Sequence, residues 1–409
     1  MPVFKPFHGM VPSVERAAQV AAVPYDVVNS KEAAVLAAGN PYSFLHVSRP
    51  EIDMEEGIDL YRDEVYAQAR KGFEKIIAEA PLTVDKEAHL YIYKLVMGEQ
   101  VQTGVFGAAS AVDYAEGRIK KHEKTRQDKE DDRTRHVMTL RSHTGPAFFT
   151  YKDNAQIDAL IAEECTKAPL FDFVAPDGIG HTLWRVDAAT SAKLSELYAG
   201  IDAFYIADGH HRSAAAARTM QECKPANPAH TGEEDYNYFL AAAFPASQLK
   251  ILPYNRAVRT LNGMTQDEFM QKLAEKFTVE LTDKATPDCG GTFKMYIDKK
   301  WYTLTPEFDI ANLGVIERLD VSILQDNVLA PMLGIEDPRT SKAIDFIGGI
   351  RGTAELEKLV NSGDFAVAFS MYPTTVAQLI DIADAGEIMP PKSTWFEPKL
   401  RDGLVCHNF

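Results

Sequence analysis

The sequence predicts a mixed α/β fold with additional α+β portions, and three observations lead to this prediction. Short apolar strands alternate with helical patterns through the middle of the chain, which is typical of sheets covered by helices. Pairs of apolar runs around tight turns, within residues 90–112 and 293–304, indicate β-hairpins. Apolar residues at helical spacing stand between the strands. The expected helices cover residues 55–79, 120–141, 213–221 and 375–385, and two more are expected between residues 154 and 198.

Length and composition indicate an ordinary globular protein of several parts. The chain has 409 residues, of which 45% are hydrophobic and 25% are charged. At roughly 150 residues per domain, this length corresponds to two or three domains. Breaks are expected near Ala80 and Leu261. They would separate an N-terminal loop and helix region (1–80), a central α/β region (81–260) and a C-terminal α+β region (261–409).

Charge and hydropathy exclude several classes of partner. The formal net charge of −16 repels a nucleic-acid backbone and anionic lipid, so neither nucleic acid nor a membrane is expected as a partner. No apolar run approaches the roughly 20 residues of a spanning helix. The N-terminus lacks the apolar core of a signal peptide, so a cytoplasmic location is expected. No Cys-x-x-Cys pair occurs, which argues against a zinc knuckle or a disulfide framework. The cysteines are Cys165, Cys223, Cys289 and Cys406.

A strand-to-helix turn carries the strongest chemical signal. The apolar run 204–207 predicts a strand, and the Ala-rich run 213–221 predicts a helix, so residues 208–212 form the turn between them. The sequence of that turn is Asp-Gly-His-His-Arg. Backbone N–H groups at the start of a helix, together with the positive end of its dipole, favour bound anions. We therefore expect a phosphate site there.

The side chains of this turn suit phosphate chemistry. Gly209 lets a ligand approach the backbone, and Arg212 can contact two phosphate oxygens at once. Ser213 can add a hydroxyl donor, and His210 and His211 favour separate contacts to an anion over joint zinc binding. Asp208 could hold Mg²⁺ or accept a proton. The alternative is an ordinary turn in which the aspartate caps the helix and the arginine forms a salt bridge.

A second phosphate-binding candidate lies near the C-terminus. Lys392, Ser393, Thr394 and Lys399 can neutralise and hydrogen-bond a phosphate, and neighbouring prolines stiffen the loop before a ligand arrives. The alternative is a surface loop with solvated lysines.

Three further polar residues are candidates on weaker signals. Glu123 lies in a densely charged segment and could serve as a general base, although charge runs are usually solvated helix faces. Asp26 and Arg256 each follow a proline beside an apolar run. The former could bind an amine or a metal, and the latter, with Asn255, could bind a carboxylate or a phosphate. An ordinary turn accounts equally well for both segments.

Taken together, these motifs resemble a known family, the one described as domain of unknown function 1015. The resemblance runs nearly end to end. It includes Lys5-Pro6-Phe7, Val23-Pro24-Tyr25-Asp26-Val27, Asn40-Pro41, Ser43-Phe44-Leu45, His122-Glu123, Asp132-Arg133, Asp208-Gly209-His210-His211-Arg212, Leu252-Pro253 and Met389-Pro390-Pro391-Lys392-Ser393-Thr394.

The Asp-Gly-His-His-Arg box is also similar to that of the archaeal free serine kinases, which belong to the ParB and sulfiredoxin superfamily. This resemblance implies a ParB/sulfiredoxin-like phosphate-binding core and phosphorylation of free L-serine to O-phosphoserine with pyrophosphate as donor. Two departures limit it. The box has no cysteine, which disfavours the redox chemistry of sulfiredoxin, and Tyr254-Asn255 replaces the Thr-His that usually precedes Arg256 in the family.

The sequence therefore leads to a specific hypothesis. Catalysis falls to Glu123, Asp208, His210 and Arg212, with Mg²⁺ on Asp208, and the substrates are L-serine with pyrophosphate or a nucleotide. The expected substrate- or phosphate-binding residues are Asp26, Gly209, His211, Ser213, Arg256, Lys392, Ser393, Thr394 and Lys399. Two alternatives stay open: a metal-dependent phosphohydrolase, and a non-catalytic ParB-like nucleotide-binding regulator.

Overall fold

The computed structural model describes residues 1–409, and their contacts group them into two compact units. The first unit comprises Met1–Leu249 and Pro398–Phe409, and the second comprises Lys250–Glu397. Both units combine sheets with helices, which confirms the mixed α+β fold. The three-part division with breaks near Ala80 and Leu261 stays a prediction. None of the helices has both the length and the apolar character that crossing a membrane requires.

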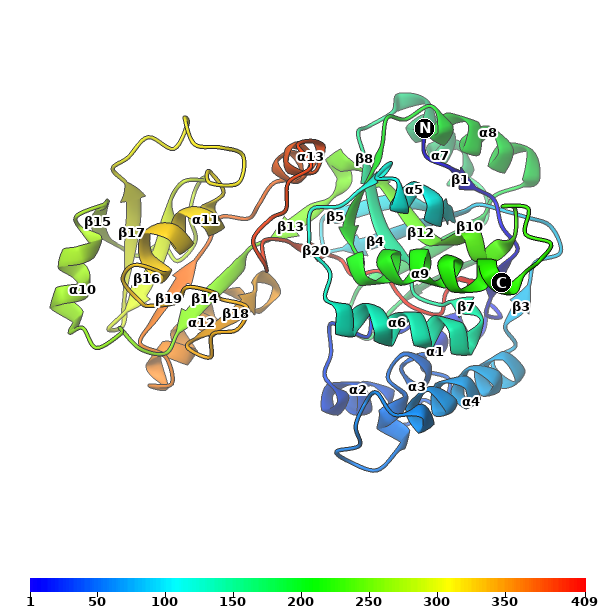
Figure 1. The fold of residues 1–409 in the computed structure, drawn as a ribbon, viewed down its shortest axis with the longest axis horizontal. Helices are drawn as coiled ribbons and strands as arrows, with labels where there is room; N and C mark the ends of the chain where they lie inside the picture. The colour runs from blue at the N-terminus through cyan, green and yellow to red at the C-terminus, as the bar shows by residue number, and fades with distance from the viewer. The chain divides into compact units, whose positions relative to one another are not determined.

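A nine-stranded sheet forms the centre of the first unit (Figure 1). Its strand order is β6-β11-β8-β12-β5-β4-β10-β9, with β1 paired to β5. The strands are β1 (Phe4–Lys5), β4 (Tyr91–Met97), β5 (Gln100–Ser110), β6 (Ile119–Lys120), β8 (Ala147–Tyr151), β9 (Phe171–Val174), β10 (Gly180–Arg185), β11 (Phe204–Asp208) and β12 (Tyr238–Pro245). The helices associated with this sheet are α5 (Ala111–Ala115), α6 (Gln127–Leu140), α7 (Ala155–Glu164), α8 (Ala188–Ala199) and α9 (His210–Ala226).

The remaining elements of the first unit form a smaller layer. A four-stranded sheet has the order β3-β2-β21-β7, so the C-terminal strand pairs between segments from the N-terminal part of the chain. Figure 1 shows α6 beside α9, with α4 on the other side of α6. These elements are β2 (Gly9–Val11), β3 (Thr83–Val84), β7 (Ser142–His143), β21 (Cys406–Asn408), α1 (Ala17–Val20), α2 (Ser30–Ala37), α3 (Leu45–Ser48) and α4 (Asp63–Glu79).

Phe4 belongs to the core of the first unit. Its side chain is 1% exposed, and its ring lies 5.0 Å from that of Tyr198 and 5.2 Å from that of Phe204. Gly107 of β5 makes room for it, because a Cβ atom there would lie 2.5 Å from the Phe4 ring. This packing holds β1 against the sheet.

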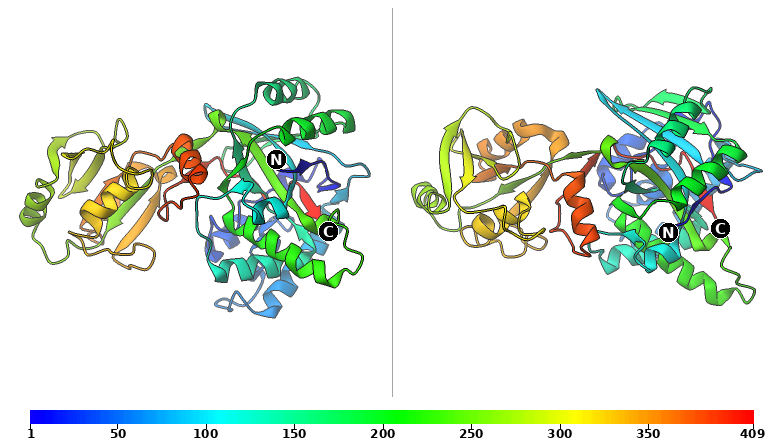
Figure 2. Two further views of the ribbon diagram at one scale, coloured as in Figure 1. Left: turned by 45° about the horizontal axis from the view of Figure 1, so that its top comes forward. Right: turned by 90° about the horizontal axis from the view of Figure 1, so that it is seen from above.

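The second unit contains a six-stranded antiparallel sheet of order β15-β17-β16-β19-β14-β18 and a two-stranded sheet of β13 and β20. Helix α12 packs against β14, β16 and β19 (Figure 2). The strands are β13 (Lys250–Leu252), β14 (Tyr254–Val258), β15 (Phe277–Thr282), β16 (Phe293–Ile297), β17 (Lys300–Pro306), β18 (Ile344–Gly348), β19 (Val367–Ser370) and β20 (Trp395–Glu397). The helices are α10 (Gln266–Leu273), α11 (Asp320–Leu324), α12 (Gly352–Asn361) and α13 (Val376–Asp384).

Two expected helices are shorter than the sequence indicated. Helix α4 begins at Asp63 because the preceding chain turns: Gly57 has a φ of +86°, and the Asp59 carboxylate accepts a hydrogen bond from the backbone N–H of Tyr61. Helix α6 begins at Gln127, so the charged segment around Glu123 is a loop. Both hairpins form as expected, from β4 with β5 and from β16 with β17.

Replacing Gly104 with alanine tests the packing of β5 against β12. A Cβ atom at Gly104 would lie 2.6 Å from the carbonyl oxygen of Ala243, so the strands must move apart. We expect Gly104→Ala to lower the free energy of unfolding by about 1–3 kcal/mol. The matched control is Gly180→Ala, whose Cβ would lie 3.4 Å from its nearest neighbour, on Val96, and we expect a change within about 0.5 kcal/mol. Urea unfolding followed by circular dichroism measures both, and equal losses would contradict this account.

Candidate active site

The Asp-Gly-His-His-Arg box lies where β11 ends and α9 begins. Gly209 has φ +87° and ψ +31°, a left-handed conformation that favours glycine, and it turns the chain within one residue. The turn is therefore shorter than the expected 208–212, and His210 is already the first residue of the helix. The first N–H groups of an α-helix have no carbonyl partner within the helix, so they are directed at the space beside Gly209.

Two cations lie next to this turn, and a carboxylate holds each of them. The Lys399 ammonium lies 2.8 Å from the Asp208 carboxylate. One guanidinium nitrogen of Arg212 lies 3.1 Å from the Asp26 carboxylate, and another donates to the carbonyl of Pro146 at 2.8 Å. Residues from four distant parts of the sequence thus meet at the start of α9, and all of them belong to the first unit.

The ionisation of Asp208 follows from these contacts. Burial alone would raise its pKa, but the charges of Lys399 and Arg212, with hydrogen bonds from Lys399 and from the Gly209 N–H, outweigh burial and hold the pKa below its usual value. The pKa of Arg212 is raised in the same way, since burial opposes the charge but Asp26, Asp402 and Asp208 outweigh it. Both groups are therefore charged at neutral pH.

His210 of the box packs against a second buried histidine, His122. His210 and His122 are 5% and 2% exposed, and their rings meet edge to face at 4.5 Å. Burial lowers the pKa of His122 to about 4 and that of His210 well below its usual value, so both rings are neutral at pH 7. Nδ1 of His210 lies 3.9 Å from the Glu123 carboxylate, whose side chain is 46% exposed. His210 Nε2 is buried without a hydrogen-bond partner.

His211 and Ser213 make local contacts. Nε2 of His211 accepts a hydrogen bond from the backbone N–H of Arg126 at 3.2 Å, and burial lowers the pKa of this histidine. Ser213 is fully buried, and its hydroxyl donates to the carbonyl of Gly209 at 3.3 Å. The Ser213 hydroxyl is therefore used inside the helix in this structure.

Not all of the candidates lie in one unit. The structure brings together Asp26, Glu123, Asp208, Gly209, His210, His211, Arg212, Ser213 and Lys399 in the first unit. Arg256, Lys392, Ser393 and Thr394 belong to the second unit.

Sequence reasoning missed Asp402, which lies near the same arginine. Its side chain is 3% exposed, and its Oδ1 atom has no hydrogen-bond partner. Burial raises its pKa to about 7, against the attraction of Arg212, Arg133 and Arg401. Gly145 permits this arrangement, because a Cβ atom there would lie 2.6 Å from Oδ1 of Asp402. The sequence around Asp402 holds no motif that could have identified it.

Tyr25 and Arg133 complete the surroundings of Arg212. The guanidinium carbon of Arg133 lies 4.0 Å from the centroid of the Tyr25 ring, and that of Arg212 lies 5.7 Å from it. Arg133 is paired with Asp132 at 2.7 Å, and Asp132 accepts a hydrogen bond from the Tyr66 hydroxyl. The tyrosine ring thus lies between two guanidinium groups whose charges are balanced by carboxylates.

The side chains of the box do not form a metal site by themselves. No group of three or more His, Cys, Asp or Glu side chains is arranged to hold a metal ion. Both carboxylate oxygens of Asp208, the expected Mg²⁺ ligand, already accept hydrogen bonds, from Lys399 and from the Gly209 N–H. Binding of Mg²⁺ at Asp208 stays a prediction.

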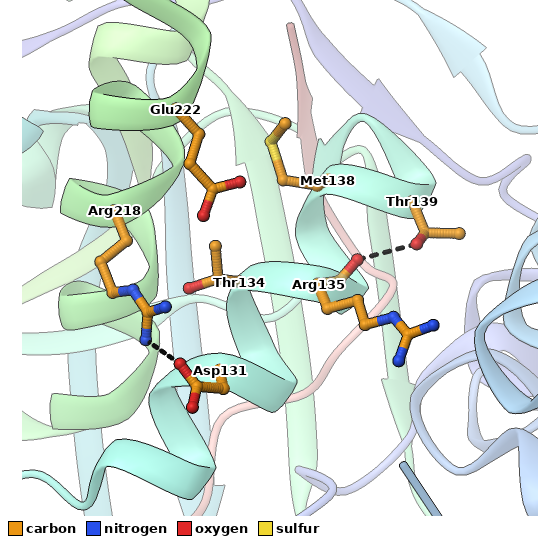
Figure 3. Close-up of a pocket in the computed structure, with 7 residues that line it drawn as sticks. All are labelled: Asp131, Thr134, Arg135, Met138, Thr139, Arg218 and Glu222. Carbon is orange, nitrogen blue, oxygen red and sulfur yellow. Dashed lines mark hydrogen bonds and ion pairs between the residues drawn. The ribbon is translucent and has the colours of Figure 1, made fainter. Parts of the chain in front are cut away.

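A separate cavity of about 330 Å³ lies between α6 and α9 (Figure 3). Its walls include Asp131, Thr134, Arg218 and Glu222, and the guanidinium of Arg218 is paired with Asp131 at 2.6 Å. None of the residues of the box lines it.

Comparison with known proteins identifies a family. A model of the family described as "Protein of unknown function (DUF1015)" matches residues 4–322, which confirms the resemblance found in the motifs. No curated protein matches the chain.

Similar solved structures differ widely in sequence from this chain. A conserved hypothetical protein from Pyrococcus furiosus is 15% identical, with a TM-score of 0.35 over 75% of this chain and 96% of its own. A free serine kinase in complex with AMP is 15% identical, with a TM-score of 0.34 over 73% of this chain and 91% of its own. SbnI with C-terminal truncation from Staphylococcus aureus is 10% identical, with a TM-score of 0.39 over 73% of this chain and 85% of its own.

The buried carboxyl group of Asp402 predicts a pH dependence of stability. The unfolded chain releases this proton near pH 4, whereas the folded chain keeps it to about pH 7. Between these values the folded state binds more protons, so its stability falls as pH rises. The variant Asp402→Asn has no carboxyl group at this position, so it does not lose stability in this way as the pH rises.

We therefore expect Asp402→Asn to gain thermal stability relative to the natural protein as the pH rises from about 5 to about 8. Thermal unfolding of both proteins across this range measures the difference. Other titrating groups, such as Asp320 with its pKa raised to about 6, are present in both proteins and cancel. A difference that does not change with pH would show that Asp402 has an ordinary pKa.

Proposed function

The chain belongs to the DUF1015 family, and from this membership and the geometry of the box we propose that it is a phosphotransferase acting on free L-serine. In this proposal pyrophosphate is the phosphate donor and O-phosphoserine is the product. The observation that carries the proposal is the start of α9, where the helix N–H groups begin and where Arg212 and Lys399 both lie close enough to Asp208 to lower its pKa. Such a set of donors favours a phosphate group.

Arg212 can bind a phosphate without losing its present partners. Its guanidinium has more N–H groups than its contacts with Pro146 and Asp26 use. The carboxylates therefore hold the cations in place before the ligand arrives. Since little reorganisation is needed at the moment of reaction, this arrangement suits charge stabilisation in phosphoryl transfer.

The proposed reaction is a direct transfer. The hydroxyl oxygen of serine forms a bond to one phosphorus atom of pyrophosphate, and the bond from that phosphorus to the bridging oxygen breaks. Inorganic phosphate leaves with the electron pair of the broken bond. The proton of the serine hydroxyl passes to a carboxylate.

Glu123 is our choice for the carboxylate that accepts this proton. Its side chain is 46% exposed and lies 3.9 Å from Nδ1 of His210. The buried ring of His210 is neutral, so it does not neutralise Glu123 as an adjacent cation would. A serine hydroxyl ionises far above neutral pH, and a positioned base typically contributes about 10²–10⁴ in rate.

An assay with the purified chain tests the proposal. We expect L-serine, Mg²⁺ and pyrophosphate to yield O-phosphoserine and inorganic phosphate in equal amounts, as measured by ³¹P NMR. ATP and ADP are tested in parallel as donors. Folded protein that forms no phosphoserine with any donor would contradict the proposal. Phosphate release without serine would indicate a phosphohydrolase, and nucleotide binding without turnover would indicate a regulator.

Removing Arg212 should abolish most of the activity. We expect Arg212→Ala to lower kcat/KM by about 10²–10³, because a donor aimed at the transferring phosphate is lost. The matched control is Arg62→Ala, since Arg62 is 57% exposed and lies outside the site, paired with Glu64. Arg212→Lys, which keeps the charge but not the planar donor, should be intermediate. Equal activity of Arg212→Ala and the control would remove Arg212 from the mechanism.

The choice of base is tested by a comparison of carboxylates. We expect Glu123→Gln to lower kcat by about 10²–10⁴ with a smaller effect on KM, and Glu116→Gln, an exposed glutamate paired with Arg118, to have no effect. Asp402→Asn provides the second comparison, because its pKa lies near neutrality. If Asp402→Asn loses the activity and Glu123→Gln keeps it, the base is not Glu123.

A further inference from the structure

The second unit contains a buried arginine without a counter-ion. Arg256 lies on β14 and is 3% exposed. Its guanidinium donates to two carbonyl oxygens, those of Tyr254 and of Lys392, the latter at 3.2 Å. No carboxylate forms an ion pair with it. Burial lowers the pKa of Arg256 to about 10, partly opposed by Tyr254.

The nearby carboxylates of the same unit have other partners. Asp345, on the neighbouring strand β18, lies 2.7 Å from a guanidinium nitrogen of Arg259. Glu397 accepts a hydrogen bond from the Trp395 indole at 2.7 Å. A buried charge is costly unless it is paired, so an anion bound beside Arg256 would lower the cost of burying it.

A second cation without an ion-pair partner, Lys392, lies on the loop that contacts Arg256. Lys392 is exposed and makes no ion pair, and its ammonium lies 5.4 Å from the centroid of the Tyr254 ring. It has a φ of +57°, a conformation that costs a residue other than glycine free energy and that clusters at functional sites. Its carbonyl is the group that accepts the hydrogen bond from Arg256, so the two residues are linked directly.

The surrounding loops are fixed by buried hydrogen bonds. The hydroxyl of Thr374 donates to the carbonyl of Ser393 at 2.9 Å, and the Ser393 hydroxyl donates to the carbonyl of Pro390 at 2.6 Å. The side-chain oxygen of Asn255 accepts from the backbone N–H of Met371. The loop that carries Lys392 is thus anchored to the strand that carries Arg256.

We propose that Arg256 and Lys392 form a phosphate-binding site in the second unit, and that its ligand carries a phosphate dianion. Charge balance favours phosphate over carboxylate as the ligand. Two cations without counter-ions are neutralised by one phosphate group with two negative charges, whereas a carboxylate would leave one positive charge uncompensated. All of the residues of this site belong to the second unit, and the site does not depend on the proposed phosphorylation of serine.

The test measures binding of inorganic phosphate and of pyrophosphate to the full chain by calorimetry at low ionic strength, without serine. We expect Arg256→Gln and Lys392→Gly each to weaken one binding event about tenfold or more. That event should persist in Arg212→Ala, which separates it from the box. The matched control is Arg259→Gln, which changes an arginine of the following loop that already has a carboxylate partner and should bind phosphate as the natural protein does.

The binding measurements can contradict the proposed phosphate site in two ways. Phosphate binding that is unchanged in folded Arg256→Gln and in Lys392→Gly would overturn the proposal, as would acetate or L-serine competing as well as phosphate. If Arg256→Gln does not fold, the binding measurement on Lys392→Gly alone tests the site. This variant should fold, because Lys392 is exposed and glycine accepts its backbone conformation. A chain that lacks this binding event but phosphorylates serine would contradict only the phosphate site of the second unit. A chain that has this binding event but does not phosphorylate serine would contradict only the proposed function.

Discussion

The backbone conformation of Gly209 is the constraint on which the site in the first unit depends. With φ at +87°, the chain leaves β11 and enters α9 within one residue, and a Cβ atom there would lie 3.3 Å from the Cα atom of Ala147. Asp208 therefore ends the strand beside Lys399, and Arg212 lies in the first turn of the helix beside Asp26. A longer turn would separate the helix N–H groups from both cations.

Charge balance explains how such a site can exist in an acidic protein. The chain carries a net charge of −16, yet the cations of the box are held by carboxylates only a few ångströms away. These carboxylates hold Arg212 and Lys399 in place, with side chains that are 12% and 13% exposed. They also make anion binding selective, because a ligand must supply enough negative charge to compete with groups that are already in place. Asp402 adds a buried carboxyl group whose charge changes near neutral pH.

The sequence was sufficient for the box and insufficient for its surroundings. An apolar run followed by Asp-Gly and an Ala-rich stretch identified the junction of β11 and α9, because strand, turn and helix each have a local signature. Contacts between distant segments of the chain have no such signature. The approach of Asp26 and Lys399 to the box depends on tertiary packing, and no motif marks Asp402. Lys392 and Lys399 are close in sequence, but the chain returns to the first unit at Pro398, so they belong to different units.

A crystal structure of the chain with pyrophosphate would test the central claim most directly. The account predicts a phosphate group within hydrogen-bonding distance of the first N–H groups of α9, with Arg212 and Lys399 both in contact and Asp26 and Asp208 still in place. Pyrophosphate bound only elsewhere on the first unit, with the start of α9 closed by protein side chains, would contradict it.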